Sequence, residues 1–380
     1  MQQENMETLE SLEDFRHFSE KELEIRFAQL KKQIVPADET IREQAEKHWG
    51  RVAKPLGSLG VLEEDIVRAA AAQGGKVPDF SKRALLIFCA DNGVVEEGVS
   101  QTGQEVTAAV VSNMTRGRSC SCLMAEKAET DVFPIDIGIA CEVEHQGKLH
   151  PLTERKIRRG TSNFTKEAAM TRQEVLTAVL TGIDAVRVLK DREYRLFTVG
   201  EMGIGNTTTS SAVASVLLRK EPELVTGCGA GLDLAGLKRK TKAIRRGIDL
   251  HQPDPMDGMD VLQKVGGFDL AAMAGAFLGG AIYHVPVVID GVIAAAAAAA
   301  AGRIAPAATD YMLAAHVSAE PASIWLLDLI GVTPAIRAGL RLGEGTGALA
   351  LFPLLDMALS IYRDMDTFAE MEIEEYKPLV

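Results

Sequence analysis

The chain has 380 residues and a formal net charge of −12, and 47% of its residues are hydrophobic but only 5% aromatic. This charge, without a long basic stretch, argues against a nucleic-acid-binding protein, and the length suits one large domain with a smaller one. The five cysteines lie among small or apolar residues, which predicts free thiols in a reducing cytoplasm. Cys120 and Cys122 lack the partners of a four-ligand site, so we predict no metal.

The first residues are acidic and polar, and they fit neither a signal peptide nor a transit peptide. We therefore expect residues 1–19 to form a mobile tail and the protein to be cytoplasmic. The apolar segment 273–301 is the one membrane candidate, but His284, Pro286 and Asp290 interrupt it. A buried strand followed by an alanine-rich helix explains this segment better than a membrane span.

Helical spacing indicates two helices near the N-terminus, and a loop rich in Pro and Gly then leads into a third. From residue 83 onward, short apolar runs alternate with helical patterns, which predicts an α/β fold with a parallel sheet covered on both faces. The strands are expected at 83–90, 130–138, 194–200 and 285–290. The helices are expected within 20–34 and at 39–49, 104–126, 171–189, 206–218, 232–250, 268–283, 305–315, 320–330 and 349–369.

Ligands of such sheets bind at the carboxyl ends of the strands, where the strand order reverses. Three loops follow predicted strands and carry polar or glycine residues: 91–93, 200–209 and 290–291. The loop in VGEMGIGNTTTSSA is the strongest local signal, because Gly203 and Gly205 let backbone amides approach an anion. The alternative for this stretch is a tight strand-to-helix turn with a good helix cap.

Two further motifs leave two interpretations each. In GCGAGLDLAGLKRK, Lys240 is either a solvated lysine on a basic helix face or a cation that reaches back to a phosphate. In RLGEGTGALALF, Glu344 lies between Gly343 and Gly345. It is either an acid near a helix start or a buried carboxylate in a site, with glycines that give a ligand room.

Taken in order along the chain, the motifs resemble one known family. They are KPLGSLG, DNGVVEEGVS, QEVT, KIRRGTSNF, GEMGIGNTT, GLDLAGLKRK, VGGFDLAAMAGAFLG, PVVIDG, SAEP and RLGEGTGALA. From about residue 54 to 368 the chain resembles nicotinate-nucleotide–dimethylbenzimidazole phosphoribosyltransferases. The resemblance implies transfer of phosphoribose from nicotinate mononucleotide to 5,6-dimethylbenzimidazole, without a redox cofactor.

The resemblance also implies an architecture: a homodimer whose subunits have a Rossmann-like parallel sheet flanked by helices, with a smaller helical domain built from both chain termini. On this chain it predicts a large substrate-binding and catalytic domain over 60–345, and a small one from 1–59 with 346–380.

The resemblance assigns roles to particular residues. Glu344 matches the catalytic carboxylate, and Lys240 matches a lysine that contacts phosphate. Ser318 matches a residue near the nicotinate or ribose. The nucleotide-binding loops match Glu201, Gly203, Gly205, Asn206, Thr207, Thr208 and Gly229, and the surroundings of the flat base match Gln104, Met202 and Leu342.

The chain departs from the family pattern at a few positions. Asn92 stands where many members have His, and Cys228 and Val317 stand in otherwise matching loops. These departures put the preferred base in question, so a sister transferase that uses another benzimidazole, a purine or a phenolic is an open alternative. A non-catalytic riboside-binding paralogue is the second alternative, although it predicts damage to Glu344, Glu201 or Lys240, and all three are intact.

Overall fold

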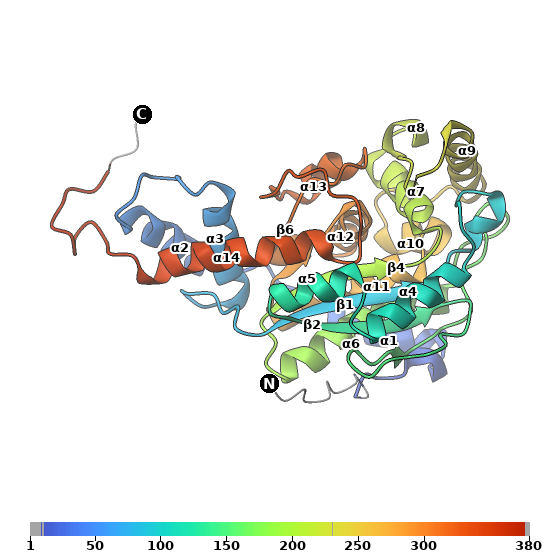
Figure 1. The fold of residues 1–380 in the computed structure, drawn as a ribbon, viewed down its shortest axis with the longest axis horizontal. Coiled ribbons are helices and arrows are strands. Elements are labelled where there is room, and N and C mark those ends of the chain that lie inside the picture. The colour runs from blue at the N-terminus through green and yellow to red at the C-terminus, as the bar shows by residue number, and fades with distance from the viewer. Residues whose placement is uncertain (1–8, 10, 230, 377–380) are drawn as a thin grey trace.

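A computed structural model describes residues 9, 11–229 and 231–376 of the chain (Figure 1). In this part of the chain the centre is a six-stranded sheet in the order β3-β2-β1-β4-β5-β6, with every neighbouring pair parallel. The order reverses between β1 and β4, as in Rossmann-like sheets, which confirms the predicted fold class. The strands are β1 (Arg83–Ala90), β2 (Thr130–Gly138), β3 (Thr153–Glu154), β4 (Leu196–Met202), β5 (Val287–Ile289) and β6 (Met312–Ala314).

The sequence of strand β1 is a continuous apolar run because both faces of the strand are buried. All eight of its residues are buried, because helices cover both faces of the sheet. Leu86 and Phe88 join the hydrophobic cluster on one face, and Leu85 and Ile87 join the cluster on the other. The helices that contribute to the first cluster are α6 (Arg172–Asp191), α7 (Asn206–Leu218), α11 (Phe268–Tyr283) and α12 (Val292–Ile304). Those that contribute to the second are α3 (Val61–Gln73), α4 (Glu105–Thr115), α5 (Cys120–Lys127) and α14 (Thr346–Asp364).

Helices α2 (Glu39–Arg51), α3 and the far half of α14 form a group to one side of the sheet (Figure 1). The ring of Tyr362 on α14 packs edge-on against His48 and Trp49 of α2, at centroid distances of 4.4 and 4.9 Å. Chain segments from both ends thus meet here, as a small terminal domain requires. The division of the chain into two domains at the predicted boundaries stays a prediction.

The N-terminal residues differ from the sequence-based expectation. Helix α1 (Glu20–Lys31) packs against α6 on the sheet and not with α2 and α3. Leu9, Leu12 and Phe15 are buried against the same region, so a mobile tail is wrong for residues 9 and 11–19. These three apolar residues lie three positions apart in an otherwise acidic and polar stretch, and the composition of that stretch gave no indication that they are buried.

Two predicted helices are also wrong in extent or type. The helix expected at 104–126 is two helices, α4 and α5, because the chain turns at Gly117 with a left-handed φ of +71°. The helix expected at 305–315 is a short 3₁₀ turn, Pro306–Tyr311, followed by the edge strand β6. A short apolar run fits a helix or a strand equally well, and pairing with β5 decides for the strand.

The remaining helices in the described part of the chain do not include a membrane span. Among the described residues, no helix is long and apolar enough to cross a membrane, and segment 273–301 forms part of α11, then β5 and part of α12. The remaining elements are α8 (Pro222–Val225), α9 (Leu234–His251), α10 (Gly258–Val265), α13 (Ser323–Ile330), and the 3₁₀ turns Phe15–His17 and Gly93–Glu97.

The pairing of α6 with α11 depends on glycines that let the two backbones approach. A Cβ atom at Gly182 of α6 would overlap the carbonyl oxygen of Ala272, and one at Gly275 of α11 would overlap that of Val179. Gly182→Ala is therefore expected to lower the free energy of unfolding by about 1–3 kcal/mol, as overpacked core positions do. Urea denaturation of the full-length protein measures this change.

Gly50→Ala in helix α2 is the matched control, because a Cβ atom there has nothing within 4 Å. It should leave stability unchanged or raise it by up to about 1 kcal/mol through the helix propensity of alanine. Equal effects of the two substitutions would show that the α6–α11 contact is not as close as described.

Candidate active site

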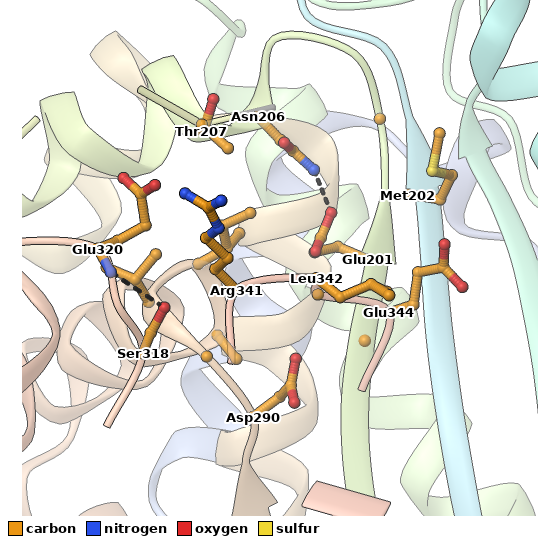
Figure 2. Close-up of a pocket in the computed structure, with 18 of the residues that line it drawn as sticks. Glu201, Met202, Asn206, Thr207, Asp290, Ser318, Glu320, Arg341, Leu342 and Glu344 are labelled. Carbon is orange, nitrogen blue, oxygen red and sulfur yellow. Dashed lines mark hydrogen bonds between the residues drawn. The ribbon is translucent and has the colours of Figure 1, made fainter. Parts of the chain in front are cut away.

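A cavity opens at the carboxyl ends of β4, β5 and β6 and is closed on one side by the loop that precedes α14 (Figure 2). This is the edge of the sheet where ligands of Rossmann-like folds bind. The residues that line it include Glu201, Met202, Gly203, Asn206, Thr207, Gly229, Asp290, His316, Ser318, Glu320, Arg341, Leu342, Gly343 and Glu344. Most of the residues assigned from the resemblance therefore come together in one place.

The glycine-rich loop after β4 lies against the end of β1. A Cβ atom at Gly203 would overlap the carbonyl oxygen of Ala90, so this position admits only glycine. Gly205 has a left-handed φ of +98° and forms the N-cap of α7, and no side chain in the described residues caps this helix. No side-chain cap from 206–209 is seen in this part of the structure. The Asn206 and Thr208 amides donate to the Gly203 and Gly205 carbonyls, which leaves the Thr207 amide as the first-turn donor without a hydrogen-bond partner among the described residues, at a helix end that suits an anion.

Lys240 lies behind this loop, which decides between its two interpretations. Its side chain is fully buried, and Nζ donates hydrogen bonds to Thr207 Oγ1 at 2.9 Å and to the Gly227 carbonyl at 3.3 Å. Burial lowers the pKa of Lys240 to about 8. The lysine is therefore not a solvated surface residue, and it places a cation next to the proposed anion site.

Glu201, at the end of β4, is a buried acid on the cavity wall. Asn206 donates a hydrogen bond to Glu201 Oε2, as Figure 2 shows. Burial raises the pKa of Glu201 well above its usual range, and the nearby acids Asp269, Asp290 and Glu344 raise it further. The surroundings of Glu201 therefore favour its neutral form.

Glu344 occupies an unusual stretch of backbone. Gly343, Glu344 and Gly345 have consecutive left-handed φ angles of +88°, +56° and +79°. A left-handed residue other than glycine costs about 1 kcal/mol, so the surrounding structure must hold Glu344 in place. At Gly200 of β4 a Cβ atom would lie 2.6 Å from the Glu344 carbonyl carbon, so glycine is needed there for the loop to pack on the strand.

The carboxylate of Glu344 is held from α5. Ser121 Oγ, which is fully buried, donates a hydrogen bond to Glu344 Oε2 at 2.9 Å. Burial raises the pKa of Glu344, and the bond from Ser121 opposes that rise. The side chain of Glu344 lies beside Met202 and points away from Asp290 (Figure 2), so it serves the cavity wall and not the cap of α14.

The residues assigned to the flat base divide into two groups. Met202 and Leu342 line the cavity near Glu344. Gln104 does not line it, because it precedes α4 and donates a hydrogen bond from Nε2 to the Asn92 carbonyl at 3.3 Å. Thr208 is likewise fully buried behind the loop and does not line the cavity.

The departures from the family pattern lie outside the cavity wall. Asn92 is fully buried beneath the loop after β4, and the Val317 amide donates to the Ile336 carbonyl. Cys228 borders a smaller neighbouring pocket with Gly205 and Thr207.

Sequence reasoning missed several residues of the site. Arg341 points into the space between Glu320 and Asn206 in Figure 2. It lies three positions before Glu344, but the sequence motif assigned no role to it. Ser121 gave no signal, because it is 223 positions from Glu344 in the sequence. Ser318 lines the cavity as expected, and its Oγ accepts a hydrogen bond from the Glu320 amide at 3.4 Å.

A family model described as a phosphoribosyltransferase matches residues 34–373. The chain belongs to this phosphoribosyltransferase family. A nicotinate-nucleotide–dimethylbenzimidazole phosphoribosyltransferase of Clostridium acetobutylicum is 43% identical over 350 residues, which are 92% of this chain and 98% of the relative. One of Escherichia coli is 39% identical over 347 residues, covering 91% and 96%. A crystal structure of one from Thermus thermophilus aligns with a TM-score of 0.82 at 37% identity, covering 89% of this chain and 100% of that one.

The hydrogen bond from Ser121 predicts how the pKa of Glu344 responds to a substitution. Ser121→Ala removes a donor that stabilises the ionised form of Glu344, so the pKa of Glu344 should rise. Carbon-detected NMR titration of labelled glutamate carboxyls, with the signal assigned by its loss in Glu344→Gln, measures the change.

Ser360→Ala is the control, because the Ser360 hydroxyl donates to the Met357 carbonyl on the exposed side of α14, away from Glu344. That variant should leave the pKa of Glu344 where it is. A pKa that stays constant or falls in Ser121→Ala would contradict the role given to this hydrogen bond.

Proposed function

We propose that the protein transfers the 5-phosphoribosyl group of nicotinate mononucleotide to 5,6-dimethylbenzimidazole or a related base, giving α-ribazole 5′-phosphate and nicotinate. This reaction belongs to the assembly of the cobalamin nucleotide loop. The observation that carries the proposal is one cavity lined at one side by the start of α7 and at the other by a partly buried carboxylate, Glu344. The names of the relatives support the choice of substrates.

The anion site suits the 5′-phosphate of the nucleotide. The N-terminus of α7 offers the Thr207 amide and the positive end of the helix dipole, and Thr207 carries the hydroxyl that accepts a hydrogen bond from Lys240. A phosphate anchored there extends its ribose along the cavity toward Ser318 and the loop at 341–344. Binding energy from the phosphate then fixes C1′ relative to the incoming base.

The reaction breaks the bond between C1′ and the pyridinium nitrogen of nicotinate, and the electron pair of that bond stays on the nitrogen. A benzimidazole nitrogen attacks the opposite face of the ribose, which inverts the configuration from β to α. The new base is then a cation that still carries a proton on its second nitrogen. Removal of this proton by Glu344 yields the neutral product and prevents the reverse reaction.

The two acids of the cavity suit different protonation states. Burial and neighbouring acids favour the neutral form of Glu201, whereas the bond from Ser121 favours the ionised form of Glu344. Two acids whose environments differ in this way indicate which one acts as the base. A raised pKa also brings Glu344 closer to the operating pH, where a general base works best.

Three further statements stay predictions: the physiological acceptor base, a homodimer, and a cytoplasmic location. Met202 and Leu342 offer an apolar wall to any flat aromatic ring, so they do not choose among benzimidazoles, purines and phenolics. Incubation of the protein with nicotinate mononucleotide and an equimolar mixture of these bases, followed by mass spectrometry of the ribosides, identifies the acceptor.

Glu344→Gln tests the reaction at its central residue. The amide keeps the shape of the side chain but is no base, so turnover should fall about 10²–10⁴-fold. Binding of dimethylbenzimidazole, measured separately by calorimetry, should stay close to that of the unmodified protein.

Glu193→Gln is the control, because Glu193 also has a left-handed φ, +68°, but lies exposed before β4 at the opposite end of that strand. Its turnover should be unchanged. Normal turnover in Glu344→Gln would rule out the general-base role, and the absence of any riboside from the unmodified protein would rule out the transferase itself.

Because Lys240 is buried, we expect kcat/KM for nicotinate mononucleotide to depend on pH in the alkaline range. The free protein loses the Lys240 charge as pH rises through about 8, so kcat/KM for nicotinate mononucleotide should fall above that pH. In Lys240→Arg the guanidinium stays charged. That variant should bind the nucleotide more weakly but lose the alkaline limb, and an alkaline limb that persists unchanged would assign it to another group.

A further inference from the structure

Asp290 directly follows β5, and its carboxylate binds the first turn of α14. It is 4% exposed, and its two carboxylate oxygens accept three backbone hydrogen bonds. Oδ2 accepts from the Gly345 amide at 3.2 Å, and Oδ1 accepts from Gly347 at 2.7 Å and from Ala348 at 3.1 Å. The first amides of a helix have no partner within the helix, and here a carboxylate 55 residues earlier in the chain satisfies them.

This carboxylate replaces the usual cap from the helix's own N-cap residue. The N-cap of α14 is Gly345, which has no side chain to offer. Burial raises the pKa of Asp290, and the three amide donors and the helix dipole oppose that rise by stabilising the ionised form. The anchor is therefore built into the sheet and does not depend on the loop that it holds.

The bond to the Gly345 amide bears directly on Glu344. The peptide group that joins Glu344 to Gly345 carries that N–H, so its direction sets the ψ angle of Glu344. Thr346 closes the loop from the other side, because its amide and its hydroxyl both donate to the Gly343 carbonyl, at 3.0 and 2.7 Å. The left-handed φ of +56° at Glu344 is thus held between two fixed peptide groups.

The neighbourhood of Asp290 leaves little room for movement. His316, which follows β6 and is buried, has Nε2 3.9 Å from Asp290 Oδ1. A Cβ atom at Gly347 would overlap the His316 ring and would lie 2.9 Å from Asp290 Oδ1. The Asp290 carboxylate is therefore packed between the His316 ring and the start of α14, and both of its oxygens accept hydrogen bonds from backbone amides there.

We propose that Asp290 is a positioning residue for Glu344: by binding the Gly345 amide it fixes the backbone from which the Glu344 carboxylate is presented to the base. This inference rests on the proposed function of Glu344 as the general base. It requires that loss of the Asp290 anchor slows the chemical step through Glu344 and through no other group.

Asp290→Asn is the first test. An amide side chain of the same shape has only one acceptor oxygen, so its NH₂ group must face at least one of the three backbone N–H groups. Displacement of a reacting group by about 1 Å can cost about 10²-fold, so kcat should fall by that order. The KM for nicotinate mononucleotide should stay near its normal value, because the anion site at Thr207 and Lys240 is untouched.

A double-mutant cycle separates positioning from general damage. If Asp290 acts only through Glu344, the variant with both Asp290→Asn and Glu344→Gln should be no slower than Glu344→Gln alone. Multiplied losses in the double variant would overturn the proposal. Asp65→Asn is the matched control, because Asp65 is also a buried carboxylate, 2% exposed, but lies in α3 away from the loop, and its turnover should be unchanged.

A second measurement needs no variant and covers the case in which Asp290→Asn does not fold. In the unmodified protein, the Gly345 amide should exchange its hydrogen as slowly as the amides of Gly347 and Ala348. Fast exchange at Gly345 alone would overturn the proposal. A failure of the proposed function is distinguishable, since Glu344→Gln would then retain full turnover while the Gly345 amide stayed protected.

Discussion

Close approach of main-chain segments at the end of β4 is the constraint on which the site depends. Gly203 lets the nucleotide loop pass the end of β1, and Gly200 lets the loop of Glu344 pack on the same strand. Because both loops lie against β4, the start of α7 and Glu344 line the same cavity. A side chain at either glycine would separate the two halves of the site before it touched any ligand.

Much of this arrangement could be predicted from sequence, because it is local. Apolar runs predicted β1 and β2, and α7 has the predicted bounds, 206–218. The errors and omissions come from long-range contacts. Pairing with β5 makes a strand of 312–314, and a hydrogen bond over 223 positions places Ser121 at the site. Neither partner leaves a periodic pattern, so the sequence around each residue could not indicate the contact.

The site gathers acids in a protein that already carries a net charge of −12. Glu201, Asp269, Asp290 and Glu344 lie close enough to raise one another's pKa or that of a shared neighbour. Burial raises the pKa of Asp269 to about 7. Each acid has a different set of donors, so their charges are not equivalent: amides hold Asp290, a serine holds Glu344, and an asparagine holds Glu201. The donors therefore favour the ionised form to different degrees in acids that burial affects in the same direction.

Helix α14 begins directly after the Glu344 loop and ends among the helices beside the sheet. Its 19 residues make a rod of about 28 Å whose far end is wedged against α2 through Tyr362. Pro353 lies inside this rod and removes one hydrogen bond of its ladder, which makes that turn the natural place to bend. Helix α14 therefore connects the position of Glu344 to the α2–α3 group, although none of the residues of that group lines the cavity.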